Sequence, residues 1–170
     1  MIKAQLTALL LALLVTPSPP PGIGAVDDFL GQADAIFVGR VIEQRSSWDE
    51  EQRLIWTDHV FEVTQWLKGG SDPIAIIKEI GGTVGGQSLT LSHPVRYQHD
   101  ASYLVFAERS TQLRTLQGAA GQLPIVEGSG GASFVKLFPQ HPLSDLSDHR
   151  GHVLQDLSVL SDRLKERIDR

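Results

Sequence analysis

The chain has 170 residues and no cysteine, and 20 aspartates and glutamates outnumber 15 lysines and arginines, giving a net charge of −5. The absence of cysteine excludes thiol catalysis, zinc–thiolate sites and iron–sulfur clusters. The acidic balance and the lack of a basic stripe indicate that the chain does not bind nucleic acid.

A secretory signal peptide is predicted at residues 1–25. Lys3 gives a short positive start, residues 6–15 are an apolar run, and residues 16–25 are rich in proline and glycine and end at Ala25. This is the three-part pattern of a cleaved leader. As a helix the apolar run would span about 15 Å, roughly half of the hydrocarbon thickness, so we expect no stable membrane anchor after cleavage. Residues 26–170, with a net charge of −6, are then a single extracytoplasmic domain, periplasmic or secreted.

Residues 26–32 form a short lead-in to a β-rich region. Residues 35–42 are β-branched and almost continuously apolar, which is typical of a buried strand. In residues 54–67, Thr57, His59 and Phe61 alternate with Trp56 and Asp58, which predicts a long strand with two different faces. Fourteen residues is long for a flat strand, so we expect a bend or bulge in it. Residues 74–80 are predicted as a third strand.

Short strands continue the pattern. The glycine-rich residues 81–86 predict a hairpin connection, and shorter strands are expected at 88–91, 103–107, 114–116, 123–126 and 133–137. This pattern indicates a mainly β fold, a small antiparallel OB-like barrel over residues 34–137. Its predicted core comprises Ile36, Val38, Phe61, Val63, Leu104 and Phe106.

The C-terminal segment has helical periodicity. Apolar residues recur at Leu157, Leu160, Leu164 and Ile168 with charged residues between them, which predicts an amphipathic helix at about 150–169. Ser147 or Asp148 is the expected N-cap. We expect this helix to cover an open side of the barrel.

The order of these segments resembles a known group. Residues 33–41 look like an opening strand, residues 56–63 lead to Leu67-Lys68-Gly69, and Gly81-Gly82 precedes the strand 103–106. The pattern resembles uncharacterised bacterial exported domains related to the netrin-like and tissue-inhibitor-of-metalloproteinases group, which implies an OB-type barrel with helical additions. The inhibitors of that group chelate the protease zinc through an N-terminal cysteine, which this chain lacks. Protease inhibition is therefore implied only by analogy of fold.

Several catalytic patterns are incomplete. Residues 81–88 match a phosphate-binding loop except that Gln87 stands in place of the lysine, so we predict no nucleotide cofactor. His149 and His152 are three residues apart, but a zinc site needs three or four converging ligands, so no metal site is predicted. Glu62 and Glu79 are expected to be charges on strand surfaces. No catalytic residue is assigned.

Three tryptophans remain as candidates for partner binding: Trp48, Trp56 and Trp66. Large aromatic side chains carry much of the energy of protein interfaces, although packing in the core or at its rim is the alternative for each of them. We therefore predict a non-enzymatic domain that binds a protein or another macromolecular partner. A small hydrolase or metal-dependent enzyme using histidines and aspartates, and a carrier of a small molecule or carbohydrate, remain as alternatives.

Overall fold

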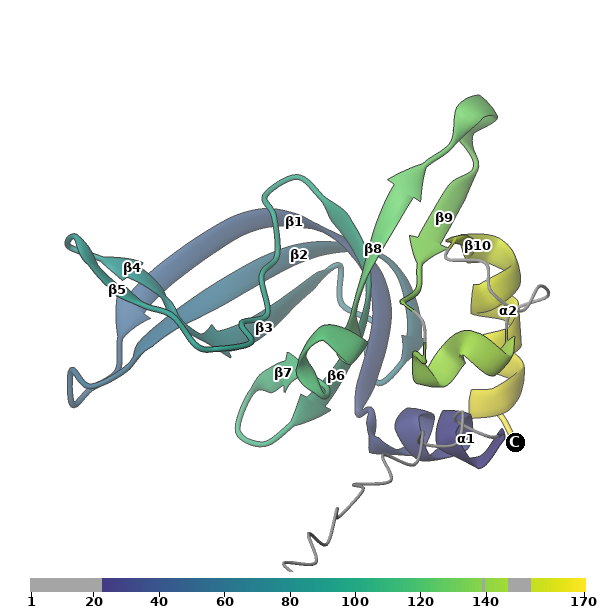
Figure 1. Cartoon of the computed structure of the whole chain (residues 1–170), viewed down its shortest axis with the longest axis horizontal. Helices are drawn as coiled ribbons and strands as arrows, with labels where there is room; N and C mark the ends of the chain where they lie inside the picture. Colours follow the sequence, from purple (N-terminus) through teal and green to yellow (C-terminus); the bar gives the residue numbers. More distant parts are fainter. Residues whose placement is uncertain (1–22, 139, 147–153) are drawn as a thin grey trace, which may run out of the picture.

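A computed structural model describes residues 23–138, 140–146 and 154–170 (Figure 1). The strands are β1 (Ala35–Trp48), β2 (Ile55–Lys68), β3 (Ile74–Ile80), β4 (Gly82–Val84), β5 (Gln87–Leu89), β6 (Ser102–Arg109), β7 (Leu113–Thr115), β8 (Gln122–Glu127), β9 (Ser133–Lys136) and β10 (Leu154–Asp156). The helices are α1 (Ile23–Gln32), α2 (Leu157–Ile168) and the short 3-10 helices η1 (Gly118–Gly121), η2 (Ser129–Gly131) and η3 (Pro142–Leu146). Among these residues no helix has the length and apolar character needed to span a membrane.

One antiparallel sheet dominates the molecule. Its strands follow the order β10-β9-β8-β6-β1-β2-β3, and β7 also pairs with β6. The β4–β5 hairpin is a separate two-stranded unit at the opposite end of the molecule from α1 and α2 (Figure 1). The predicted mainly β, antiparallel character and the C-terminal helix are confirmed.

The sheet does not close into a barrel through backbone pairing. No ladder joins β3 to β7 or to β10 in the part of the chain that the structure describes. The backbone N–H of Thr115 in β7 instead donates a hydrogen bond of 2.7 Å to the Glu79 side chain in β3. A side chain thus bridges the seam where a closed barrel would have a strand ladder.

Both faces of the central strands are buried. On one face Ile36 and Phe106 belong to the helix-side cluster, the apolar core shared with α1, α2 and η3. On the other face Phe37 and Val105 belong to the inner cluster, which also contains Phe61 and Tyr97. This explains why residues 35–42 are almost continuously apolar, since a strand covered on both sides has no polar face.

The six predicted core residues are therefore divided between two cores. Ile36, Val38, Leu104 and Phe106 are buried in the helix-side cluster. Phe61 is buried in the inner cluster and Val63 packs against it with partial exposure. The prediction of a single core that contains all six residues is wrong, because neighbouring strands of this sheet present apolar side chains to both of its faces.

The long strand β2 contains the predicted irregularity. Its pairing with β1 shifts register at three places, and one shift falls where Val38 pairs with Gln65 and Gly39 pairs with Val63, leaving Thr64 without an opposite residue. An extra residue reverses which side chains face inward. Consequently both Phe61 and Trp66 pack with the inner cluster although their sequence parity differs.

Glycine makes two of the turns possible. Gly69, after β2, has φ +76°, and a Cβ there would lie 1.9 Å from the carbonyl oxygen of Asp34. Gly85 and Gly86, with φ of +57° and +81°, form the turn of the β4–β5 hairpin. The predicted hairpin connection is therefore confirmed at Gly85-Gly86, whereas residues 82–84 of the predicted loop form strand β4.

The first described element is a helix where an irregular lead-in was predicted. α1 begins at Ile23, so the predicted cleavage point after Ala25 falls inside its first turn, while residues 1–22 lie outside the described residues. Val26, Phe29 and Leu30 are buried in the helix-side cluster. Their i, i+3, i+4 spacing is that of the apolar side of a helix.

The C-terminal helix begins later than predicted. Residues 154–156 form β10, which pairs with β9, so the predicted start near residue 150 is wrong. The N-cap of α2 is Asp156, whose carboxylate accepts hydrogen bonds from the backbone N–H groups of Ser158 and Val159. The predicted caps Ser147 and Asp148 lie outside the described residues. Aspartate at this position satisfies amide groups that the first helical turn leaves free.

Candidate functional site

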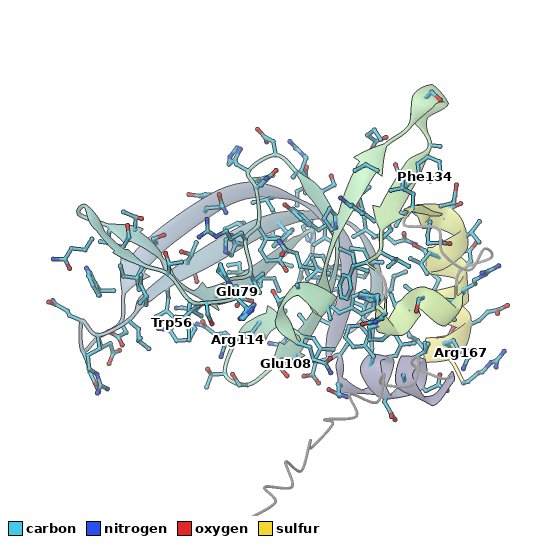
Figure 2. All side chains as sticks on the ribbon, viewed as in Figure 1. Trp56, Glu79, Glu108, Arg114, Phe134 and Arg167 are labelled. Carbon is cyan, nitrogen blue, oxygen red and sulfur yellow. The ribbon has the colours of Figure 1, made fainter. Side chains whose placement is uncertain are left out.

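Two pockets lie on opposite faces of β1, β2 and β3. The outer pocket, about 390 Å³, is lined by Trp48, Asp49, Trp56, Lys78 and Arg114 together with neighbouring residues. The inner pocket, about 400 Å³, is lined by Gln44, Thr57, His59, Glu79 and Tyr97 and by the β4–β5 hairpin. Figure 2 shows Trp56, Glu79 and Arg114 in one part of the molecule, away from Arg167 of α2.

The outer pocket combines an indole with two cations. The guanidinium carbon of Arg114 lies 5.4 Å from the centroid of the Trp56 ring, and Lys78 Nζ lies 5.9 Å from it. These distances are within the range of cation–π attraction. Lys78 is also 3.8 Å from the Asp58 carboxylate, whereas Arg114 Nε is buried without a hydrogen-bond partner. The pocket therefore holds a donor whose hydrogen bond is not made within the described part of the protein.

The three candidate tryptophans occupy two different environments. Trp48 and Trp56 both line the outer pocket. Trp66 packs against Phe37 at a centroid distance of 5.0 Å, and its indole N–H donates to the carbonyl oxygen of Asp72 at 2.7 Å. The register shift near Thr64 separates them, because it places Trp66 on the inner side of β2.

In the inner pocket His59 is held in one tautomer. The side-chain amide nitrogen of Gln44 donates to the carbonyl oxygen of Tyr97 at 2.8 Å, which fixes the amide orientation. The same nitrogen lies 2.8 Å from His59 Nδ1. Nδ1 therefore accepts a hydrogen bond, and the proton of the neutral ring is on Nε2. Burial lowers the pKa of His59 to about 4, while the nearby Asp58 opposes that shift, so the ring is neutral at pH 7.

Glu79 is the one acidic side chain that lines the inner pocket. It is only 7% exposed, so the expectation of a charge on the strand surface is wrong for this residue. Its side chain faces inward because it lies directly across from Thr57 in the β2–β3 register. Glu62 agrees with that expectation, since it is exposed and forms an ion pair of 2.9 Å with Arg40.

The deeper wall of the inner pocket is aromatic. The Tyr97 ring lies 5.0 Å from the His59 ring and 4.9 Å from the Phe61 ring. Its hydroxyl is 2.8 Å from the Thr115 hydroxyl. Burial, the largest cause, raises the pKa of the Tyr97 phenol, which keeps this group neutral. The inner face thus changes along the strands from an apolar aromatic core to a polar pocket.

The other histidines do not assemble a site within the described residues. His93 and His99 are exposed, and His99 lies 3.0 Å from the Asp100 carboxylate. His141 is buried in the helix side of the molecule, where Nε2 contacts the carbonyl oxygen of Ala120 at 2.8 Å and Nδ1 accepts from Leu143 N–H. His149 and His152 lie outside the described residues. Elsewhere no three histidines, aspartates or glutamates are grouped so that they could hold a metal ion.

Sequence reasoning missed the residues that complete both pockets. Lys78, Arg114 and Gln44 carried no signal, because each is an ordinary polar residue of a strand and its neighbours depend on strand register. Glu79 carried a usable signal: the alternation of Ala75, Ile77 and Glu79 places it on the apolar face of β3. A carboxylate in such a position is unusual and marks the inward face as partly polar.

Comparisons with known proteins complete the description of the site. Models of protein families, curated protein sequences and solved structures yielded no match to this chain. Its function is therefore inferred from its own residues and their geometry.

Proposed function

We propose that the protein is an extracytoplasmic, non-enzymatic binding domain that engages a protein partner through the outer pocket. The extracytoplasmic location rests on the leader pattern of residues 1–25. The observation that carries the binding proposal is the meeting of Trp48 and Trp56 with Lys78 and Arg114 around one open pocket.

An OB-like barrel related to the netrin-like group is part of this proposal. β1, β2 and β3 follow one another in the sheet, β6 returns to pair with β1, and β7 pairs with β6. The hydrogen bond between Thr115 and Glu79 links β7 to β3. These relations support the strand path of a five-stranded barrel that is completed by side chains at its seam.

The chemistry of the outer pocket suits a peptide segment. Half-buried tryptophans offer a large apolar surface that a partner can desolvate, and such residues commonly dominate interface energies. The Arg114 guanidinium lines the pocket and favours a hydrogen-bond acceptor, such as a backbone carbonyl or carboxylate of the partner. Asp49 also lines the pocket, but its carboxylate already accepts the backbone N–H groups of Arg53 and Leu54.

A non-enzymatic role is favoured by the distribution of titratable groups. His59 and Asp58 are adjacent in β2 and lie on opposite faces, so they do not form a catalytic pair. Within the described residues His59 contacts Gln44 and Tyr97, with no hydroxyl or carboxylate in hydrogen-bond contact with its ring. Hydrolysis of ester or peptide substrates by the purified protein, abolished in His59→Gln, would contradict the non-enzymatic role and support the hydrolase alternative.

The test is capture of partners from the extracellular or periplasmic fraction with the mature domain as bait. Wild type, Trp48→Ala and Trp56→Ala are compared with Val159→Ala, which removes an exposed apolar side chain from α2. We expect wild type and Val159→Ala to retain the same partner. With either tryptophan variant the amount of retained partner should fall by at least about tenfold. Equal retention by all four proteins contradicts the outer pocket as the binding surface.

A further inference from the structure

We infer that the inner pocket is a second binding site, which takes the ammonium group of a small organic cation at Glu79. The site is independent of the outer pocket, because it lies on the other face of the same strands and shares no lining residue with it.

The first argument is the unbalanced charge of Glu79. Its side chain is 7% exposed, and none of the ion pairs among the described residues includes it. Its one hydrogen bond comes from the backbone N–H of Thr115 to Oε1. Burying a carboxylate is costly unless a counter-charge and hydrogen bonds compensate. A cationic ligand would supply the missing counter-charge and bond to the second oxygen.

The second argument is the set of hydrogen-bonding groups that line the same pocket. The Gln44 side-chain nitrogen is used by Tyr97 and His59, which leaves its carbonyl oxygen as an acceptor with no partner in the described chain. An ammonium group has three donors and no acceptor. It therefore suits a pocket whose lining offers acceptors, Glu79 Oε2 in its buried part and Gln44 Oε1 at its exposed side.

The third argument concerns shape and the surrounding apolar surface. Tyr97 and Leu89 line the inner pocket together with the polar groups. The apolar side chains of the lining, which include Leu89 and Leu91, accommodate a short alkyl chain. The volume of about 400 Å³ suits a small molecule. Arg96 is the one cationic side chain of the lining, and it is exposed to solvent, where screening weakens its repulsion.

Glu79 also has a structural role, which the test must separate from binding. Glu79→Gln keeps an oxygen that accepts the Thr115 N–H and removes the negative charge. We therefore expect its denaturant midpoint to stay close to that of wild type while its affinity for the cation falls. Glu79→Ala removes both the acceptor and the charge, so it should lose the seam contact as well.

The experiment is a titration of the purified protein with n-butylammonium chloride at pH 7.5, followed by amide chemical shifts. Wild type should shift at Glu79, Gly81, Gly82 and Thr115, and n-butanol, the neutral analogue, should not reproduce these shifts. In Glu79→Gln the dissociation constant should rise by about tenfold to a hundredfold, as expected when a charged hydrogen bond is lost. The matched control Glu108→Gln, an exposed carboxylate of β6, should bind as wild type does.

Two source molecules share this chemistry, and a second titration distinguishes them. N-acetyl-lysine amide tests whether the ammonium of a protein side chain is accepted, while n-butylammonium represents a free amine. Binding of n-butylammonium alone identifies a free amine as the ligand, and comparable binding of both identifies the basic side chain of a peptide as a further source. Either result requires that the shifts map to the inner pocket.

Three outcomes would overturn the inference without relying on a stable Glu79 variant. The first is that the wild-type shifts map outside the inner pocket, and the second is that n-butanol causes the same shifts as n-butylammonium. The third outcome is weaker n-butylammonium binding in Arg96→Gln, since removing a like charge should leave the affinity unchanged or raise it. Trp56→Ala should bind n-butylammonium normally, so failure of the outer-pocket proposal remains distinguishable from failure of this one.

Discussion

The two faces of β1 and β6 are equally well buried but are built differently. The helix-side cluster joins Phe106 to Phe29 of α1, with ring centroids 5.1 Å apart, and the ring of the buried His141 packs against the same Phe29 at 5.6 Å. The inner cluster begins with the same kind of packing around Phe61 and then gives way to His59 and Glu79. The first face is packed mainly with apolar side chains, whereas the second gives way along its strands to a pocket lined by polar groups.

This difference shows that the two faces of one sheet have different roles. α1, α2 and η3 cover the helix-side face with apolar side chains, and the pocket of about 370 Å³ on this side is formed by α1, α2 and Lys68 at the end of β2. Among the described residues, no helix covers the inner face at the β4–β5 end (Figure 1). The inner pocket at that end is lined by the buried polar side chains of His59 and Glu79, and both binding proposals concern this end of the molecule.

The largest expected loss of stability comes from truncating a buried phenylalanine in either cluster. Phe106→Ala and Phe61→Ala should each lower the free energy of unfolding by about 3–5 kcal/mol, because both side chains are fully buried and a cavity replaces each of them. Denaturant melts measure the loss. A loss below about 1 kcal/mol for either variant would show that the corresponding face is not packed as described.

Hydrogen exchange sharpens the same comparison. Phe106 contacts Phe29 of α1, so Phe106→Ala should accelerate amide exchange in α1 more than near Tyr97. Phe61 lies 4.9 Å from Tyr97, so Phe61→Ala should do the reverse. Equal acceleration in both regions by both variants would mean that the two clusters unfold as one unit.

Acid provides a second, smaller perturbation. Burial lowers the pKa of His59 from 6.5 to about 4, so between these values the unfolded chain binds a proton that the folded chain excludes. The stability from neutral His59 is therefore complete above pH 6.5 and is lost as the pH falls toward 4, by up to about 3 kcal/mol. The free energy of unfolding measured at steps from pH 7 to pH 4 tests this.

His141, the buried histidine on the helix side, serves as the control for His59. Burial also lowers the pKa of His141, against the hydrogen bond to Ala120, so its contribution has the same sign. His59→Gln should flatten part of the pH dependence and His141→Gln another part. If His59→Gln leaves the profile unchanged, His59 is not buried as a neutral ring.

The smallest effect concerns the helix that covers the helix-side face. Asp156→Ala removes the N-cap of α2 and should cost about 1 kcal/mol. Asp156→Asn keeps an acceptor and should cost less. Thermal melts of the two variants measure the difference, and equal stability of Asp156→Ala and wild type would place the start of α2 elsewhere.

Much of the fold was predictable because it depends on local pattern. The apolar run at 35–42 indicated a buried strand, the length of residues 54–67 indicated a bulge, and Gly85-Gly86 marked a hairpin turn. The same local reasoning misplaced the start of α2, since Leu154 fits the helical spacing but pairs with Lys136 of β9. Pairing between distant segments overrode the periodicity there.

The pockets were only partly predictable because they depend on strand register. Trp56 and Trp66 have the same parity in the sequence, and a one-residue bulge near Thr64 places them in different environments. Arg114 reaches Trp56 from a strand almost sixty residues later. Neither a bulge position nor such a long-range neighbour is encoded in the pattern of a single segment.

The most direct test of the central claim is a paired measurement on Trp56→Ala and Trp66→Ala, recording both partner affinity and the free energy of unfolding. We expect Trp56→Ala to weaken partner binding by about 2 kcal/mol or more with little loss of stability. Trp66→Ala should instead lower stability, because its ring packs against Phe37, and should leave the affinity of the folded fraction unchanged. If Trp56→Ala unfolds the domain, or if Trp66→Ala alone abolishes binding, the outer pocket is not the partner site.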